Sequence, residues 1–131
     1  MRAIVLDSSV GAKWFRDEAG SAEARELLRA HGRGEVAIVV PSLFVYEVFG
    51  VAARELTTAE LAGLWRRFIA WRIRVREMDA ALVPAALAVR DRLGCSLYDA
   101  FAPAVAEQAG APLYSADERA HKAWPGVVIV G

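Results

Sequence analysis

The sequence predicts an α/β domain with a mostly parallel sheet and helices on both of its faces. Short apolar runs, suited to strands, alternate along the chain with longer stretches of helical periodicity. The runs are continuously apolar, which is typical of parallel strands that are buried on both faces. With 131 residues, 56% of them hydrophobic, the chain has the size and apolar content of one domain spanning residues 1–131.

In the first half of the chain, two strands are each followed by a helix. Residues 3–6 and residues 36–40 are the expected strands, because each run is too short and too uniformly apolar for a helix. The stretch 21–28 is expected to be helical and to be ended by the glycines that follow it. A serine directly after the second strand caps a further helix, expected over residues 42–55.

The next helix begins with a capping box, in which Thr57 and Glu60 satisfy each other's backbone N–H groups. Its apolar residues recur at the spacing of one helical face, which predicts that this face packs on the core. They are Leu61, Leu64, Trp65, Phe68 and Ile69. A brief strand over residues 73–76 is expected to follow this helix.

The last third of the chain continues the alternation. Asp79 is expected to cap a helix that lasts to residue 93. Ser96 and Asp99 form a capping box for another helix, which ends near residue 109. The remaining elements are short, with strands over residues 112–115 and 127–130 and a helix over residues 117–123.

Charge and cysteine content exclude several classes of protein. Sixteen Lys and Arg residues balance sixteen Asp and Glu residues, which argues against a generally basic nucleic-acid binder. The single cysteine rules out an intrachain disulfide and fits a reducing compartment. No signal-peptide pattern opens the chain, and Pro41 and Ser42 interrupt its longest weakly charged stretch, residues 36–53. We therefore expect a cytoplasmic protein that does not enter a membrane.

Four acidic residues are expected at the edge of the sheet where the strands end, namely Asp7, Glu47, Asp99 and Asp117. Ligands of open parallel sheets bind beyond this edge. Taken singly, each aspartate has an ordinary role as a helix cap, and Glu47 can pair with an arginine or lie at the wet margin of its helix. Taken together, four carboxylates repel one another, and a hard divalent cation such as Mg²⁺ or Mn²⁺ relieves the repulsion. Such a cation orients water against a phosphodiester, which is the substrate class that we expect.

The segments around these carboxylates resemble the motifs of PIN-domain ribonucleases, and in particular of VapC-type toxins of type II toxin–antitoxin systems. In chain order they are Asp7-Ser8-Ser9, Glu47, Ser96-Leu97-Tyr98-Asp99-Ala100 and Leu113-Tyr114-Ser115-Ala116-Asp117. The resemblance implies a three-layer α/β/α PIN-like domain and an endoribonuclease that depends on Mg²⁺ or Mn²⁺. It implies that the four carboxylates are catalytic and bind the metal, with Ser9 and Ser115 as neighbours that bind substrate or donate hydrogen bonds. It also implies an RNA substrate, a cognate VapB-like antitoxin that blocks the site, and a homodimer.

Other functions remain open at this point. A PIN-type nuclease can act in RNA processing or on DNA without being a toxin. A non-catalytic module, either receiver-like or a degenerate PIN domain, is a second alternative, although all four acidic residues are present. A phosphatase of the haloacid-dehalogenase type needs a second aspartate two residues after the strand-end aspartate, and Ser9 occupies that position.

A basic, aromatic segment follows residue 60. Between residues 61 and 76 there is no acidic residue, and the five arginines are Arg66, Arg67, Arg72, Arg74 and Arg76. These arginines suit contact with RNA, contact with the antitoxin, or a solvated helix face, and the sequence does not choose among the three. The interleaved Trp65 and Phe68 follow the apolar stripe, so we expect them in the core.

One proline lies inside a predicted helix, and the two histidines stand far apart in the chain. Pro103 lies within the helix that bears Asp99, and it cannot donate a hydrogen bond to the Asp99 carbonyl four residues earlier. A kink there would alter the placement of the Asp99 side chain. His31 and His121 lack the spacing of a metal site, and we expect both on the surface.

Overall fold

The computed structural model describes residues 2–131, in which five strands form a single sheet with the order β3-β2-β1-β4-β5. All four strand pairings are parallel, so the predicted sheet is confirmed and is wholly rather than mostly parallel. The strands are β1 (Arg2–Leu6), β2 (Val36–Pro41), β3 (Arg74–Arg76), β4 (Leu113–Ser115) and β5 (Val128–Ile129). β1 occupies the centre, which brings the ends of β1 and β4 together at one edge.

Seven α-helices and one 3₁₀ turn connect the strands within the described residues. They are α1 (Ser8–Gly11), the 3₁₀ turn η1 (Ala12–Trp14), α2 (Ser21–Gly32), α3 (Ser42–Ala52), α4 (Thr58–Trp71), α5 (Leu82–Leu93), α6 (Leu97–Ala109) and α7 (Glu118–His121). Every expected helix is present, and the capping box of Thr57 and Glu60 opens α4 as predicted. The short helix α1 and the turn η1 were not predicted from the sequence.

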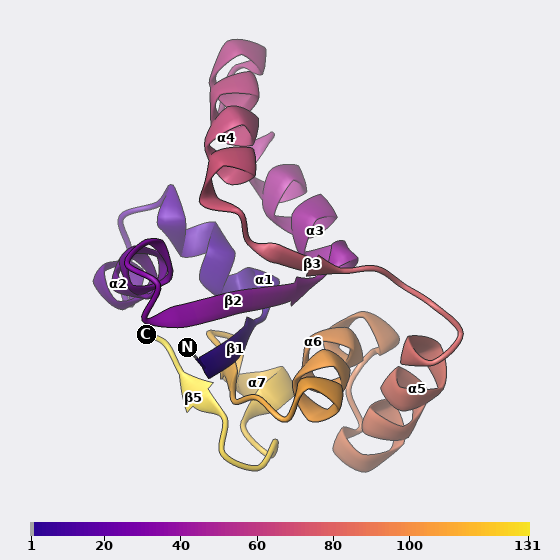
Figure 1. Cartoon of the computed structure of the whole chain (residues 1–131). Helices are drawn as coiled ribbons and strands as arrows, with labels where there is room; N and C mark the ends of the chain where they lie inside the picture. The colour runs from indigo at the N-terminus through magenta and orange to yellow at the C-terminus, as the bar shows by residue number, and fades with distance from the viewer. Residues whose placement is uncertain (1) are drawn as a thin grey trace.

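The sheet separates two apolar cores, one on each face. Ile4 and Leu6 of β1 face the core formed with α1, α2, α3 and α4, whereas Val5 faces the core formed with α5 and α6. These three side chains are fully buried, as expected for a central parallel strand. Figure 1 shows the resulting arrangement, with α3 and α4 on one side of the sheet and α5 and α6 on the other. The three-layer α/β/α architecture is thereby confirmed.

Helix α4 extends away from the sheet beside α3 (Figure 1). Only Leu64 and Phe68 of its apolar stripe are buried, while the side chains of Trp65 and Ile69 are 47% and 56% exposed. The expectation that Trp65 lies in the core is therefore wrong. Trp65 lies at the outer side of the contact between α4 and α3, where it packs edge-on against Phe49 at 5.6 Å and stacks on Phe68 at 5.9 Å between ring centroids.

No helix within residues 2–131 is both long enough and apolar enough to cross a membrane.

Candidate active site

The four predicted carboxylates line one cavity of about 400 Å³ at the edge of the sheet where β1 and β4 end. Asp7 directly follows β1, and Asp117 lies two residues after the end of β4. Glu47 projects from α3, and Asp99 from the first turn of α6. All four are half-buried. The fold thus brings together residues that lie up to 110 positions apart in the sequence.

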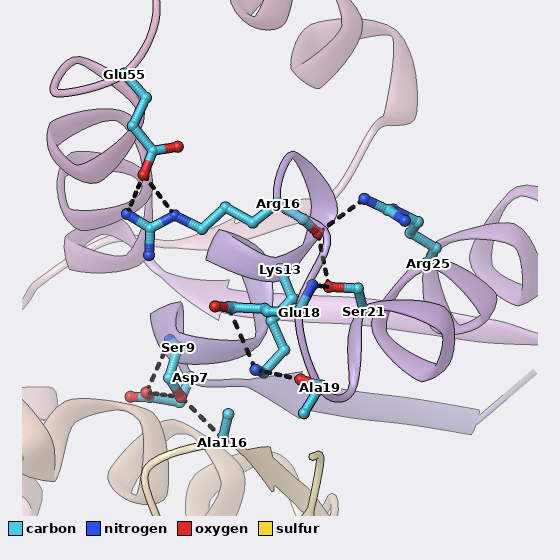
Figure 2. Close-up of polar contacts among 10 residues, drawn as sticks. All are labelled: Asp7, Ser9, Lys13, Arg16, Glu18, Ala19, Ser21, Arg25, Glu55 and Ala116. Carbon is cyan, nitrogen blue, oxygen red and sulfur yellow. Dashed lines mark hydrogen bonds and ion pairs between the residues drawn. The ribbon is translucent and has the colours of Figure 1, made fainter.

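Ser9 holds the carboxylate of Asp7 in place through two hydrogen bonds. Asp7 Oδ2 accepts hydrogen bonds from the Ser9 backbone N–H at 3.0 Å and from the Ser9 hydroxyl at 2.6 Å. The same hydroxyl oxygen accepts the backbone N–H of Ala116 at 2.9 Å, as Figure 2 shows. Asp7 therefore caps α1, and Ser9 links this cap to the loop that leads to Asp117.

The surroundings of Glu47 disfavour the charged form of its side chain. Burial raises the pKa of Glu47, the negative charges of Asp7 and Asp99 raise it further, and the hydrogen bond from the Ser8 hydroxyl opposes them. The Ser8 Oγ lies 3.1 Å from Glu47 Oε1. Among the described residues no Lys or Arg forms an ion pair with Glu47, so the arginine partner considered for it is not found. Glu47 is half-buried and lines the cavity instead.

Asp99 and Asp117 form the wall that the main cavity shares with a second cavity of about 350 Å³. The Ser96 hydroxyl accepts the Asp99 backbone N–H at 3.1 Å, which is one half of the predicted capping box. Asp117 Oδ1 accepts the backbone N–H of Ala120 at 3.1 Å and so caps α7. The exposed side chain of Arg119 lines the second cavity.

Two cations that the sequence analysis did not identify, Lys13 and Arg16, also line the main cavity, together with Glu18. Lys13 Nζ donates to the Ala19 carbonyl at 2.6 Å and lies 3.3 Å from Glu18 Oε1. The Arg16 guanidinium donates to Glu55 Oε1 through two nitrogens, at 2.9 and 2.7 Å (Figure 2). Both residues were missed because α1 and η1, which turn the chain back toward the cavity, are too short for their periodicity to be recognised.

The oxygen-rich lining of the main cavity suits a hard divalent cation. Its donors are carboxylates and hydroxyls, and no histidine or cysteine is among the lining residues. Within residues 2–131, however, no group of three or more His, Cys, Asp or Glu side chains is placed to hold a metal ion directly. Mg²⁺ is commonly held by one or two carboxylates and several waters, so the donor set fits such an ion although the carboxylates do not form a closed cage.

Ser115 and His121 lie behind this site, and neither residue is exposed to solvent. The expectation that His121 is a surface residue is therefore wrong. Its Nδ1 lies 2.7 Å from the Ser115 hydroxyl and its Nε2 lies 2.7 Å from the carbonyl oxygen of Asp99. Helix α6 runs through Pro103 without ending, and the Asp99 carbonyl that the proline leaves free is bound by the histidine.

The second histidine also has a structural role rather than a surface one. His31 is half-buried at the end of α2. Its Nδ1 accepts the backbone N–H of Ile38 at 3.0 Å, and its Nε2 lies 2.7 Å from the Trp71 carbonyl oxygen. Because a carbonyl oxygen only accepts, Nε2 carries the proton and the ring joins β2 to the end of α4.

The arginine segment divides into two parts. Arg76 is half-buried and paired, with its guanidinium 3.0 Å from Asp79 Oδ2 and 2.7 Å from Gln108 Oε1. The other four are exposed and, among the described residues, have no ion-pair partner; they are Arg66, Arg67, Arg72 and Arg74. Arg72 also lines an apolar groove of about 450 Å³ between α3, α4 and β3, together with Tyr46 and Trp65.

Comparison with known structures supports the same fold. A toxin–antitoxin complex from Klebsiella pneumoniae is 17% identical, with a TM-score of 0.74 and 95% of each chain covered. VapBC2 from Rickettsia felis, bound to a DNA fragment from its promoter, is 14% identical, with a TM-score of 0.71 over 98% of this chain and 97% of that one. PAE2754 from Pyrobaculum aerophilum is 21% identical, with a TM-score of 0.63 over 99% and 92%. At such identities the likeness shows the fold alone.

Sequence comparison identifies the family. No curated protein matches the chain significantly. The family model of the PIN domain matches residues 4–124, which include all four carboxylates of the cavity. The chain therefore belongs to the PIN-domain family.

Proposed function

We propose that this PIN domain is a metal-dependent endoribonuclease that acts as the toxin of a toxin–antitoxin pair. PIN domains are nucleases, and they generally use divalent metals. The observation that carries the proposal is the convergence of Asp7, Glu47, Asp99 and Asp117 on one cavity. A carboxylate that only caps a helix needs no second carboxylate nearby. Four carboxylates around a single opening repel one another, which costs free energy unless a cation binds among them.

The four carboxylates would hold Mg²⁺ or Mn²⁺, which when bound polarises a phosphodiester and lowers the pKa of water. Ser9 orients Asp7 through its backbone N–H and its hydroxyl, both of which bind Oδ2, so that Asp7 Oδ1 would be available to the cation. Ser115 is fully buried, so it would support the site from inside the fold rather than contact the substrate. Glu47 Oε2, the oxygen that Ser8 does not bind, would hold a water of the cation's shell and accept its proton, a task for which a raised pKa is suited.

The cationic wall of the cavity gives the site its affinity for a nucleic-acid backbone. The chain carries no net charge, so attraction to RNA has to be local. Lys13 and Arg16 both line the cavity that holds the carboxylates. A phosphate that enters the cavity would compete with Glu18 and Glu55 for these two cations while it meets the metal-binding oxygens.

The toxin role draws its support from the solved structures of similar fold. Three of these are described as a toxin–antitoxin complex or as VapBC bound to DNA. In this chain, the apolar groove lined by Tyr46, Trp65 and Ile69 offers exposed aromatic surface for a protein partner. We infer a VapB-like antitoxin as that partner, a homodimer as the assembly and the cytoplasm as the place of action.

The test is cleavage of RNA by the purified chain. With Mg²⁺ or Mn²⁺ it should cut RNA and leave 5′-phosphate ends, and EDTA should stop the reaction. Asp99→Asn is the matched variant, because the Asp99 carboxylate makes no hydrogen bond to the described residues and its charge can be removed at nearly constant shape. This variant should fold and lose cleavage. Undiminished cleavage in EDTA, or cyclic-phosphate ends, would refute the metal-dependent mechanism.

A further inference from the structure

A chain of hydrogen bonds through His121 joins the backbones of two carboxylate residues. The Asp99 carbonyl oxygen can only accept, so His121 Nε2 carries the proton and donates it at 2.7 Å. The unprotonated Nδ1 then accepts the hydroxyl proton of Ser115 at 2.7 Å. The Ser115 oxygen in turn accepts the backbone N–H of Asp117 at 3.0 Å. The ring and the Ser115 hydroxyl thus link the Asp99 carbonyl to the Asp117 amide.

Pro103 explains why the Asp99 carbonyl is available for this bond. In an uninterrupted α-helix that carbonyl would accept the N–H of residue 103. Proline has no N–H, and its ring displaces the carbonyl four residues earlier. In α6 the helix continues past Pro103 and the side chain of His121 supplies the donor that proline removes. The two residues are complementary, although 18 positions separate them.

We propose that His121 is a positioning residue that fixes Asp99 relative to Asp117 through the carbonyl freed by Pro103. This inference rests on the proposed nuclease function, in which both aspartates hold the metal. His121 is fully buried and lines neither of the two cavities that Asp99 and Asp117 share, so among the described residues it acts only through others. Its ring sets the separation of the two backbones and hence of the two carboxylates at the cavity wall.

Mn²⁺ binding by the full chain, measured by titration calorimetry, tests the proposal without requiring turnover. His121→Leu removes both hydrogen bonds and keeps an apolar side chain of comparable size. It is expected to weaken Mn²⁺ binding by about 10- to 100-fold, the usual effect of removing a group that orients metal ligands. At Mn²⁺ concentrations well below both dissociation constants, the apparent kcat of RNA cleavage should fall in the same proportion with KM for RNA nearly unchanged, because Lys13 and Arg16 are not altered.

The matched control is His31→Leu. His31 makes two hydrogen bonds of the same kind, to the Ile38 N–H and the Trp71 carbonyl, on the opposite face of the sheet from α6. Its loss should lower the stability of the fold and leave the Mn²⁺ affinity of the folded protein unchanged. Equal Mn²⁺ affinities for His121→Leu and His31→Leu would mean that His121 only stabilises the fold, and would overturn the proposal.

Two further comparisons isolate the bond to Asp99. Pro103→Ala restores an N–H that can reach the Asp99 carbonyl, so the double variant Pro103→Ala/His121→Leu should bind Mn²⁺ more tightly than His121→Leu alone. His121→Gln keeps a donor near the Nε2 position and His121→Asn does not, so the Gln variant should bind Mn²⁺ more tightly than the Asn variant. This polar pair also provides the test if His121→Leu does not fold. If the two variants of either comparison bind Mn²⁺ with equal affinity, the role of the hydrogen bond to the Asp99 carbonyl is refuted.

The outcome for the wild-type chain separates this inference from the proposed function. A wild-type protein that neither binds Mn²⁺ nor cuts RNA would refute the nuclease function and the positioning role with it. A wild-type protein that does both, alongside an unaffected His121→Leu variant, would refute the positioning role alone.

Discussion

Gly11 sets the distance between α1, which carries Ser8 and Ser9, and α3, which carries Glu47. A Cβ atom added at Gly11 would lie 2.5 Å from Cζ of Phe44 and 2.8 Å from Cγ2 of Val48. Carbon atoms in contact prefer roughly 3.5–4.0 Å, so Gly11→Ala requires the two helices to separate by about 1 Å. Phe44 and Val48 are buried and cannot move into solvent, being 1% and 3% exposed.

The expected cost of Gly11→Ala follows from two opposing terms. Overpacking a buried contact costs about 1–3 kcal/mol, while replacing a helical glycine by alanine recovers about 0.5–1 kcal/mol. The free energy of unfolding should therefore fall by up to about 2.5 kcal/mol, and by about 1 kcal/mol at the middle of both ranges. With an unfolding entropy of about 2.1 cal/mol/K per residue, the middle value corresponds to a Tm lower by roughly 4 °C and the upper value to roughly 9 °C.

Gly50→Ala is the control, because no atom lies within 4 Å of a Cβ at that exposed position in α3. This variant gains the stabilisation of replacing a helical glycine by alanine without any overpacking, so its Tm should rise by roughly 2–4 °C. Both variants would be measured by calorimetric melting and by urea unfolding. The separation of α1 from α3 should also break the contact of Ser8 with Glu47 and reduce RNA cleavage in Gly11→Ala only. A Gly11→Ala protein as stable as Gly50→Ala would refute the close packing of the two helices.

Two further predictions concern charge. The pKa of Glu47 is raised in the folded state, so the protonated residue stabilises the fold below its unfolded pKa of about 4.3, and this contribution is lost as the pH rises through the folded value. In EDTA, Glu47→Gln should therefore be more stable to urea than the wild type at pH 8 and should lose this advantage at pH 4. A variant less stable than the wild type at pH 8 would contradict a raised pKa of Glu47. Replacing Arg66 and Arg67 by Gln tests the exposed arginines through the salt dependence of RNA binding. If the two arginines neutralise phosphates, the slope of the logarithm of the RNA-binding constant against the logarithm of salt concentration should become shallower by about 0.7 for each arginine removed. An unchanged slope together with weaker antitoxin binding would mean that the arginines contact the antitoxin instead.

The order of the strands and helices could be predicted because each carries its own local signal. The run Ala3-Ile4-Val5-Leu6 is apolar without alternation, and Thr57 with Glu60 marks a helix start in the sequence itself. The helix α1 gives no such signal, since four residues hold barely one turn and cannot show a period. The exposure of Trp65 was missed because an apolar stripe does not reveal whether its helix rests on the sheet or on another helix.

The members of the cavity could be predicted in part. Asp7 follows β1 directly and Asp117 lies two residues after β4, so the topology of a parallel sheet places them at one edge. His121 could not be found in this way, because its burial depends on a carbonyl that Pro103 frees in another helix. The sequence showed that the Asp99 carbonyl lacks its helical donor, but only the tertiary structure shows which side chain replaces it.

The central position of β1 has a consequence for the order in which the protein is made. β1 is synthesised before the other strands, yet its neighbour β4 is complete only at residue 115, more than a hundred residues later. Asp7 therefore leaves the ribosome long before Asp117 and His121 do. A nascent chain has no complete cavity until these residues emerge, and any product that stops before Asp117 is expected to lack the proposed nuclease activity.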